Sequence, residues 1–379
     1  MSGGMELYLH MPFCVRKCAY CDFLSFPSGA KTQRMYAKRL MEDIGVMGKR
    51  YGEIPVETIF IGGGTPSVPD SGLIVEIMEH VRHAFHVADG AEISMEANPG
   101  TVTREKLTDY RKAGINRLSF GLQSANDREL KLLGRIHTWA EFLESFTLAR
   151  ECGFANLNID LMSALPGQTC ESWKETLSRV TDLDPEHISA YSLIIEEGTP
   201  FGERYGSEEG RKLLPDEDSE REMYHETKRF LKDCGYERYE ISNYAKPGRE
   251  CRHNIGYWTG GPYLGLGLGA SSYLDGCRFT VNPDMKQYLE EKPGMFTDIE
   301  KLTKKDMEEE FFYVGLRMTA GVSLSEFERR FGISAKEVYP GLMETFVKEK
   351  AAHFEGDRFV LTDYGLDVSN YIMAQFLQD

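Results

Sequence analysis

The chain has no apolar run close to the ~20 residues of a membrane-spanning helix, so we expect no bilayer crossing. Its N-terminus, MSGGMELYLH, has neither the basic start nor the long apolar core of a secretory signal. Basic residues are scarce: 44 Lys and Arg stand against 60 Asp and Glu, a net charge of −16. This balance argues against a nucleic-acid partner, which needs a basic face. We expect a cytoplasmic protein, with peripheral membrane contact left open.

The chain does have cysteines, eight in all, and three lie on one short segment with the spacing C-x3-C-x2-C: Cys14, Cys18 and Cys21. In a reducing compartment such residues are thiols or metal ligands. A structural zinc site needs four ligands, and His10, inside the first expected strand, is the available fourth. The CAYC pair also resembles a thiol-redox motif. An iron–sulfur cluster held by three cysteines would keep one iron open to an external ligand.

Strand-like apolar runs alternate with helix-like segments along the first 245 residues. We expect strands at 6–10, 58–62, 92–96, 117–121, 156–161, 187–193 and 239–244, and helices at 32–49, 72–85, 104–113, 125–152, 171–181 and 220–234. This alternation predicts βαβ units with a parallel sheet. Six or seven units indicate an α/β fold with a partial, TIM-like (β/α)6 barrel, and an open doubly wound sheet is the rival arrangement.

The sequence pattern changes near residue 300, from alternating strands and helices to successive helices. Three helices are expected at 309–317, 323–331 and 335–350, followed by a hairpin at 351–363. This order predicts a small winged-helix-like domain over 301–379, after a barrel at 1–245 and a connecting segment at 246–300. Such modules often bind DNA. Residues 300–379 hold 10 basic against 15 acidic side chains, so we interpret the module as a cover or docking domain.

Polar residues gather where the expected strands end, which is where barrels of this kind place their sites. A glycine turn, GGGTP, follows the second strand and lets a ligand approach the backbone closely. Glu96 ends the third strand, and its carboxylate suits ribose hydroxyls or an ammonium group. An acid within the fifth strand needs a partner or a ligand, because burying it alone is costly. Further candidates follow from the same pattern: Gln123, Arg135 and Asp160.

The cysteine spacing, with Tyr20 just before the third cysteine, resembles the radical S-adenosylmethionine (SAM) signature. The motifs LYLHMPFC, CAYCDF, IGGGTPS, MEANPGT, SFGLQS, LGRIH and NIDLMSALPGQT resemble the oxygen-independent coproporphyrinogen III oxidase family over nearly the whole chain. The resemblance implies that the three cysteines hold a [4Fe–4S] cluster whose fourth iron is chelated by SAM. It implies SAM contacts for Tyr8, Gly63 and Glu96, and second-SAM positions at Tyr20, Gly64, Thr65, Gln123, Arg135 and Asp160.

Two features separate the branches of this family. In the decarboxylating branch of the family, a long segment precedes the cysteine loop and a further cysteine stands where this chain has Phe23. The haem-chaperone branch instead carries the motif HNxxYW. This chain reads HNIGYW from His253, so the resemblance implies haem contact there, although a histidine satisfied within a polar turn is the plain alternative. The family often has GAHSY further on, where this chain has Ser271 in place of the histidine.

We therefore expect a haem chaperone that binds haem and a SAM-ligated cluster and passes haem to an acceptor, such as a respiratory haem protein. The alternative is an enzyme, a coproporphyrinogen III dehydrogenase that uses SAM-radical oxidative decarboxylation. A radical enzyme on another tetrapyrrole and a zinc-stabilised binding module also remain open. The sequence leaves undecided whether the protein catalyses a reaction.

Overall fold

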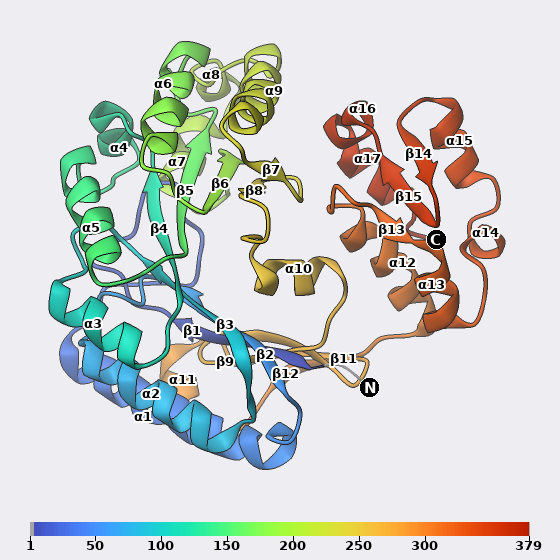
Figure 1. The fold of residues 1–379 in the computed structure, drawn as a ribbon. Coiled ribbons are helices and arrows are strands. Elements are labelled where there is room, and N and C mark those ends of the chain that lie inside the picture. Colours follow the sequence, from blue (N-terminus) through green and yellow to red (C-terminus); the bar gives the residue numbers. More distant parts are fainter. Residues whose placement is uncertain (1–3, 379) are drawn as a thin grey trace.

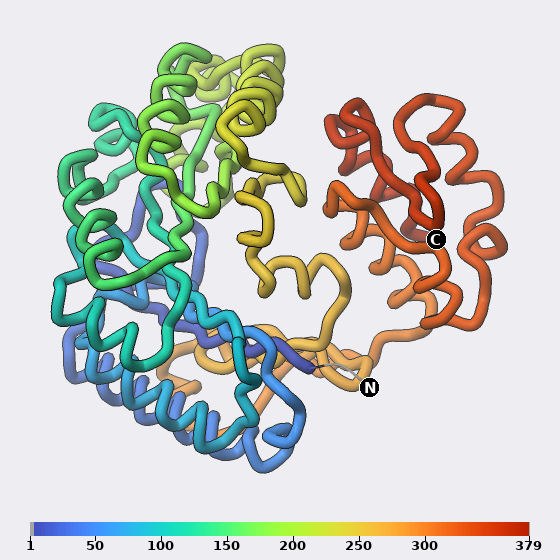
Figure 2. The backbone as a smooth tube through the Cα atoms, viewed as in Figure 1, coloured from blue at the N-terminus to red at the C-terminus, as the bar shows by residue number. Residues whose placement is uncertain are grey.

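The computed structural model describes residues 4–378, which form a large part with a twelve-stranded sheet and a small part with a three-stranded sheet (Figure 1). The chain passes from the large part to the small one near residue 300 (Figure 2). Within this described range, no helix combines the length and the apolar character needed to cross a membrane.

Six parallel strands lie side by side in chain order, each followed by helical structure that covers the outside of the curved sheet (Figure 1). This arrangement confirms the predicted partial (β/α)6 barrel. The strands are β1 (Met5–Met11), β2 (Val56–Gly63), β3 (Val87–Ala97), β4 (Arg117–Gln123), β5 (Leu157–Ser163) and β6 (His187–Ser192). The helices are α1 (Ala30–Tyr51), α2 (Ser71–Ala84), α3 (Arg104–Lys112), α4 (Asp127–Leu132), α5 (Trp139–Glu151), α6 (Cys170–Thr181), α7 (Pro200–Tyr205), α8 (Glu208–Arg211) and α9 (Glu217–Asp233).

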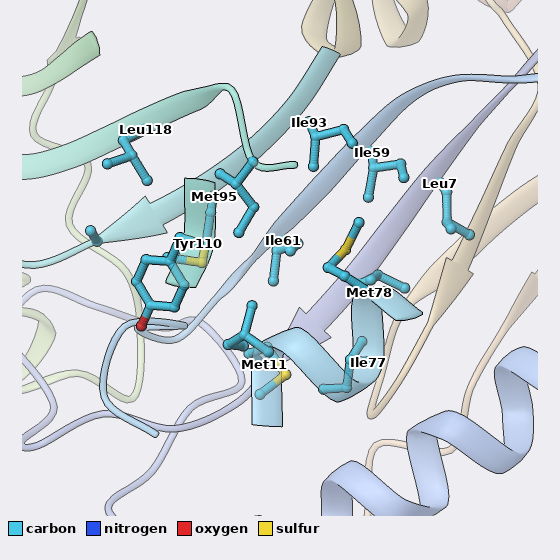
Figure 3. Close-up of a cluster of buried hydrophobic side chains, with 14 of the residues drawn as sticks. Leu7, Met11, Ile59, Ile61, Ile77, Met78, Ile93, Met95, Tyr110 and Leu118 are labelled. Carbon is cyan, nitrogen blue, oxygen red and sulfur yellow. The ribbon is translucent and has the colours of Figure 1, made fainter. Parts of the chain in front are cut away.

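Side chains alternate between the two faces of these strands, as the pleat requires. On β3, Ile93 and Met95 are buried in the core that Met78 of α2 completes (Figure 3). Burial of each such side chain stabilises the fold by about 1.5–3 kcal/mol. Ser94 and Glu96 lie on the opposite face, towards the barrel interior, where Ser94 accepts a hydrogen bond from buried Arg117. The interior of the barrel is therefore polar, and its outside is apolar.

The segment 246–300, predicted to connect the two parts, adds structure to the sheet beyond β1. Strand β9 (Tyr263–Leu266) pairs parallel with β1, and the antiparallel strands β10 (Ser271–Leu274), β11 (Cys277–Thr280) and β12 (Thr297–Lys301) extend that edge. Helix α11 (Met285–Glu290) packs beside α1. Helix α10 (Arg252–Trp258), which carries HNIGYW, lies between the barrel and the small part (Figure 1).

The small part confirms the predicted winged-helix-like domain. Its antiparallel sheet has the order β13-β15-β14, and two aromatic side chains, Phe312 and Phe376, stack at 4.3 Å in its core. The elements are α12 (Lys304–Gly315), β13 (Val322–Ser323), α13 (Leu324–Phe331), α14 (Ala335–Val338), α15 (Leu342–Lys348), β14 (Ala352–Glu355), β15 (Arg358–Leu361), α16 (Asp363–Asp367) and α17 (Ser369–Ala374). The last two helices were not predicted.

Three predicted elements are wrong in detail. The single helix at 125–152 is two helices, because Gly134 has φ +76° and ends the first. The helix at 335–350 is likewise divided, by Pro340 and by Gly341 at φ +75°. The strand at 239–244 is replaced by β7 (Glu237–Arg238) and β8 (Asn243–Ala245), because the carboxylate of Glu240 accepts hydrogen bonds from Ser242 N and from the Asn243 side chain and so turns the chain between them.

Candidate active site

The cysteine loop, residues 12–29, joins β1 to α1 and is fixed by backbone hydrogen bonds at several points. Cys14 N donates to Phe26 O at 3.1 Å, and Ala19 N donates to Leu133 O at 3.0 Å. Ala19 O accepts from Phe201 N of α7 at 2.9 Å. The first bond closes the loop on itself, and the other two attach it to elements that follow β4 and β6, so the positions of the thiols depend on both sides of the barrel.

The glycine turn after β2 lies against the start of the cysteine loop. Gly64 N donates to Met11 O at 2.9 Å, and Thr65 N donates to Phe13 O at 2.7 Å. A Cβ on Gly64 would come within 2.9 Å of three backbone atoms at the end of β1 and the start of that loop, so only glycine allows this approach. The hydroxyl of buried Thr65 consequently lies 3.5 Å from the sulfur of Cys14.

Glu96 and Asn98 project from the end of β3 towards the same turn. The carboxylate of Glu96 accepts a hydrogen bond from Gly63 N at 3.0 Å. Burial raises the pKa of Glu96 to about 7, and the negative charge of Asp160 adds to this effect. Asn98 donates to Thr65 Oγ1 at 2.7 Å. The polar residues that end the second, third and fifth strands therefore act on one another across the barrel.

Arg135, in the turn between α4 and α5, links the cysteines to this group. Its guanidinium donates to Cys18 Sγ at 3.4 Å, to Asn98 Oδ1 at 2.6 Å and to Gly121 O. Gln123 ends β4 with φ +74°, an uncommon conformation for a residue other than glycine that is typical of functional sites.

Asp160 on β5 accepts hydrogen bonds from Ser119 Oγ at 2.9 Å and from Asn158 Nδ2 at 2.7 Å. Burial nevertheless raises the pKa of this carboxyl. The expectation that an acid among apolar strand residues needs partners is met here by neighbouring polar side chains.

These side chains line a single pocket of about 120 Å³. Among the described residues, those predicted from the sequence that line it are Cys14, Cys18, Tyr20, Cys21, Gly63, Gly64, Thr65, Glu96, Gln123, Arg135 and Asp160. Asn98 and Ser119 also line it and were missed. The signal that could have found them is the two-residue period of a strand, since Asn98 follows Glu96 and Ser119 precedes Gly121 on the same faces.

Two predicted site residues, Tyr8 and His253, are not among the described residues that line this pocket. Tyr8 lies on the wall of a second, larger cavity. His253 is 1% exposed, with Nδ1 at 2.7 Å from Thr58 Oγ1 and Nε2 at 3.0 Å from Tyr257 Oη. Burial, followed by the charge of Arg117, lowers the pKa of His253 to about 3. His253 is thus a neutral, fully bonded side chain behind Tyr257.

His10, the alternative fourth ligand, is also engaged elsewhere. Its ring nitrogens lie 3.0 Å from Tyr8 Oη and 2.9 Å from Leu24 O. Within residues 4–378, no three His, Cys, Asp or Glu side chains are grouped to hold a single metal ion. The three loop cysteines are free and half-buried, and they line one pocket together. This donor set, with a guanidinium on one thiol, fits an iron–sulfur cluster with three protein ligands.

Comparisons with known proteins agree with this geometry. Residues 8–180 match the family model described as the radical SAM superfamily, and residues 302–368 match the HemN C-terminal domain. The solved structure of coproporphyrinogen III oxidase (HemN) from Escherichia coli, a radical SAM enzyme, is similar with a TM-score of 0.85. That likeness covers 99% of this chain and 90% of that chain at 24% identity, and it shows a common fold. Fold and site together define a radical SAM protein.

Curated relatives extend over the full length. The chain is 35% identical to heme chaperone HemW of Bacillus subtilis, covering 98% of each chain. It is also 35% identical to heme chaperone HemW of Escherichia coli, covering 99% of this chain and 98% of that one. The heme chaperone HemW of Lactococcus lactis is 34% identical, with coverage of 98% and 97%. The chain belongs to the HemW family.

Proposed function

We propose that the protein binds haem, holds a SAM-ligated [4Fe–4S] cluster, and passes haem to an acceptor protein. The observation that carries the proposal is the helix with HNIGYW, α10, which brings Tyr257 and Trp258 to the junction of the two parts of a full-length HemW-family chain. We propose a respiratory haem protein as the acceptor. Free thiols at all eight cysteines support a cytoplasmic site of action.

Cys14, Cys18 and Cys21 would hold the cluster. When bound, the cluster supplies one-electron chemistry and an open iron for the amino and carboxylate groups of SAM. The carboxylate of Glu96 and the backbone at Gly63 form a polar wall of the same pocket, which suits the ammonium and ribose groups of SAM. The family resemblance also implies second-SAM contacts for six further residues of the pocket: Tyr20, Gly64, Thr65, Gln123, Arg135 and Asp160.

Tyr8 and His253 have roles nearer to haem in this proposal. Tyr8 lies on the wall of the larger cavity, and its ring stacks at 6.4 Å on Phe60, which stacks at 5.3 Å on His253. His253 would support haem binding from behind Tyr257, since both of its ring nitrogens already have partners. Direct ligation of iron by His253 would break the hydrogen bond of the ring nitrogen that binds the metal.

The test is a haem titration of the anaerobically reconstituted full chain, followed by mixing with an apo-cytochrome b as acceptor. We expect a Soret change that saturates near one equivalent, and then transfer of haem to the acceptor. A Cys234→Ser variant serves as the control, because exposed thiols bind haem adventitiously. Absence of saturation contradicts the proposal, and so does turnover of coproporphyrinogen III to a decarboxylated product in the presence of SAM and reductant.

A further inference from the structure

A cavity of about 900 Å³, here called the interdomain cavity, lies between α10 and the small domain. The barrel contributes Tyr8, α10 and the hairpin of β10 and β11, and the small domain contributes α12 and α13. Cavities that bury a small ligand measure about 300–1,000 Å³, so this one is large enough for a macrocycle. Aromatic side chains form much of its wall, including Tyr257, Trp258, Tyr263 and Phe311.

The wall of the interdomain cavity is positively charged in an otherwise acidic protein. It carries four cationic side chains and two carboxylates, an excess of two positive charges, whereas the chain as a whole has −16. A ligand with two carboxylates matches that excess. The cations are Lys304, Arg278, Arg330 and Arg358, and the carboxylates are Glu310 and Glu326.

Arg330 is the cation best placed to accept a new carboxylate. Its partner Glu326 already receives two hydrogen bonds from Arg329, at 2.7 and 2.6 Å. Arg330 also donates to Glu326 at 2.6 Å and to Thr259 O of the large part at 3.2 Å. Because Arg329 neutralises Glu326 by itself, Arg330 can turn to a ligand without leaving that acid unpaired.

Two sequence features that lie apart in the chain meet at this cavity. Tyr257 and Trp258 come from HNIGYW, and Ser271, singled out as a departure from a glycine-rich motif, lies on the opposite hairpin. Trp258 is held by Arg317 of the small domain, whose guanidinium lies 4.4 Å from the ring centroid. Its indole N–H has no hydrogen-bond partner among the described residues. The motif is therefore aimed at the junction of the two domains.

We infer that haem binds in the interdomain cavity, with its ring against the aromatic wall and its two propionates on Arg330 and the neighbouring Arg278 and Arg358. This assignment rests on the proposed function, which sets haem near Tyr257 but does not name the groups that hold its propionates. The small domain then supplies part of the haem site. Release to an acceptor requires the two domains to separate at α10, α12 and α13.

Two pairs of variants test the site by haem titration of the full chain. Val314→Trp on α12 fills the cavity, and its control, Tyr313→Trp, changes an exposed neighbour on the same helix. Arg330→Gln removes a carboxylate partner, and Lys336→Gln is its control, because Lys336 is an exposed cation of the small domain outside the cavity wall and makes no contact with Glu326. We expect each cavity variant to weaken haem binding about tenfold and each control to bind within about twofold of wild type.

Haem dimethyl ester, which has no propionate charges, shows whether Arg330→Gln weakens haem binding through the lost charge or through a change in the fold. Wild type should bind the ester about tenfold more weakly than haem, and Arg330→Gln should bind the ester as wild type does. Equal haem affinity of wild type and both cavity variants would place haem elsewhere and leave the proposed function standing. Failure of wild type to bind haem at all would overturn both. If Val314→Trp does not fold, judged by circular dichroism, the comparison of Arg330→Gln with Lys336→Gln decides the question.

Discussion

Glu6 offers a direct test of the polar barrel interior beneath the haem motif. Its carboxyl is 7% exposed on β1, and its Oε2 has no hydrogen-bond partner among the described residues. Burial raises the pKa of Glu6 to about 9, and the negative charge of Glu92 adds to the shift. Nδ1 of His253 lies 4.0 Å from Oε2, but that imidazole is neutral. Glu6 is therefore protonated in the folded protein at neutral pH.

The magnitude follows from the proton balance. In the unfolded chain Glu6 ionises near pH 4.5, whereas the folded protein retains the proton up to about pH 9. Between these values the folded state binds more protons, so its stability falls as pH rises, by about 1.4 kcal/mol per pH unit. At pH 7 this costs about 3 kcal/mol. Glu6→Gln removes the titration while keeping the shape of the side chain.

Urea unfolding of the apo-protein, followed by circular dichroism between pH 5 and 8, measures this effect. Glu6→Gln should be more stable than wild type by under about 1 kcal/mol at pH 5 and by about 3 kcal/mol at pH 7, with a further rise at pH 8. Glu57→Gln, at an exposed position on β2, is the matched control and should show no such trend. A stability difference that does not grow with pH would refute the reasoning.

Three further predictions concern the two sites. Gly63→Ala should impair SAM binding measured by calorimetry, because φ at Gly63 is +108° and a Cβ there would overlap the ring of His10 on β1. The control Gly90→Ala, also at positive φ (+77°) but in open space, should bind SAM normally. Arg135→Gln should leave cluster loading intact but lower the cluster reduction potential by about 60 mV in a potentiometric EPR titration, since it removes a charged donor to a ligand sulfur. A potential unchanged from wild type would contradict this. Gly256→Ala should weaken haem binding, because a Cβ there would overlap the Glu6 carboxylate, and Glu6→Ala in the same chain should restore the affinity.

Much of the cysteine pocket could be predicted from the sequence because its residues follow strands. Parallel strands place their carboxyl ends at one edge, so polar residues after successive apolar runs meet there. The same reasoning did not reach Asn98 and Ser119, since only one polar residue was considered for each strand, Glu96 for β3 and Gln123 for β4. The fold confirms the order of strands and helices, but Gly134 was overlooked as a helix end.

The interdomain cavity could not be predicted. It depends on the docking of a domain 40 or more residues beyond α10, where Arg317 packs on Trp258 and Arg330 reaches Thr259 O. Local periodicity carries no information about such contacts. The strands of segment 246–300 were also not predicted. They have about four residues each and are separated by glycine-containing turns, as at Gly267 with φ +97°.

The central claim is that three thiolates leave one iron of a cluster free for SAM. The most direct measurement is EPR of the anaerobically reconstituted, reduced full chain, recorded with and without SAM and paired with iron and sulfide analysis. The account predicts four iron atoms per chain, a [4Fe–4S] spectrum whose g values change when SAM is added, and loss of that signal in Cys18→Ser. An EPR spectrum that is unchanged when SAM is added, or a chain that binds a single zinc ion and no sulfide, would contradict this claim.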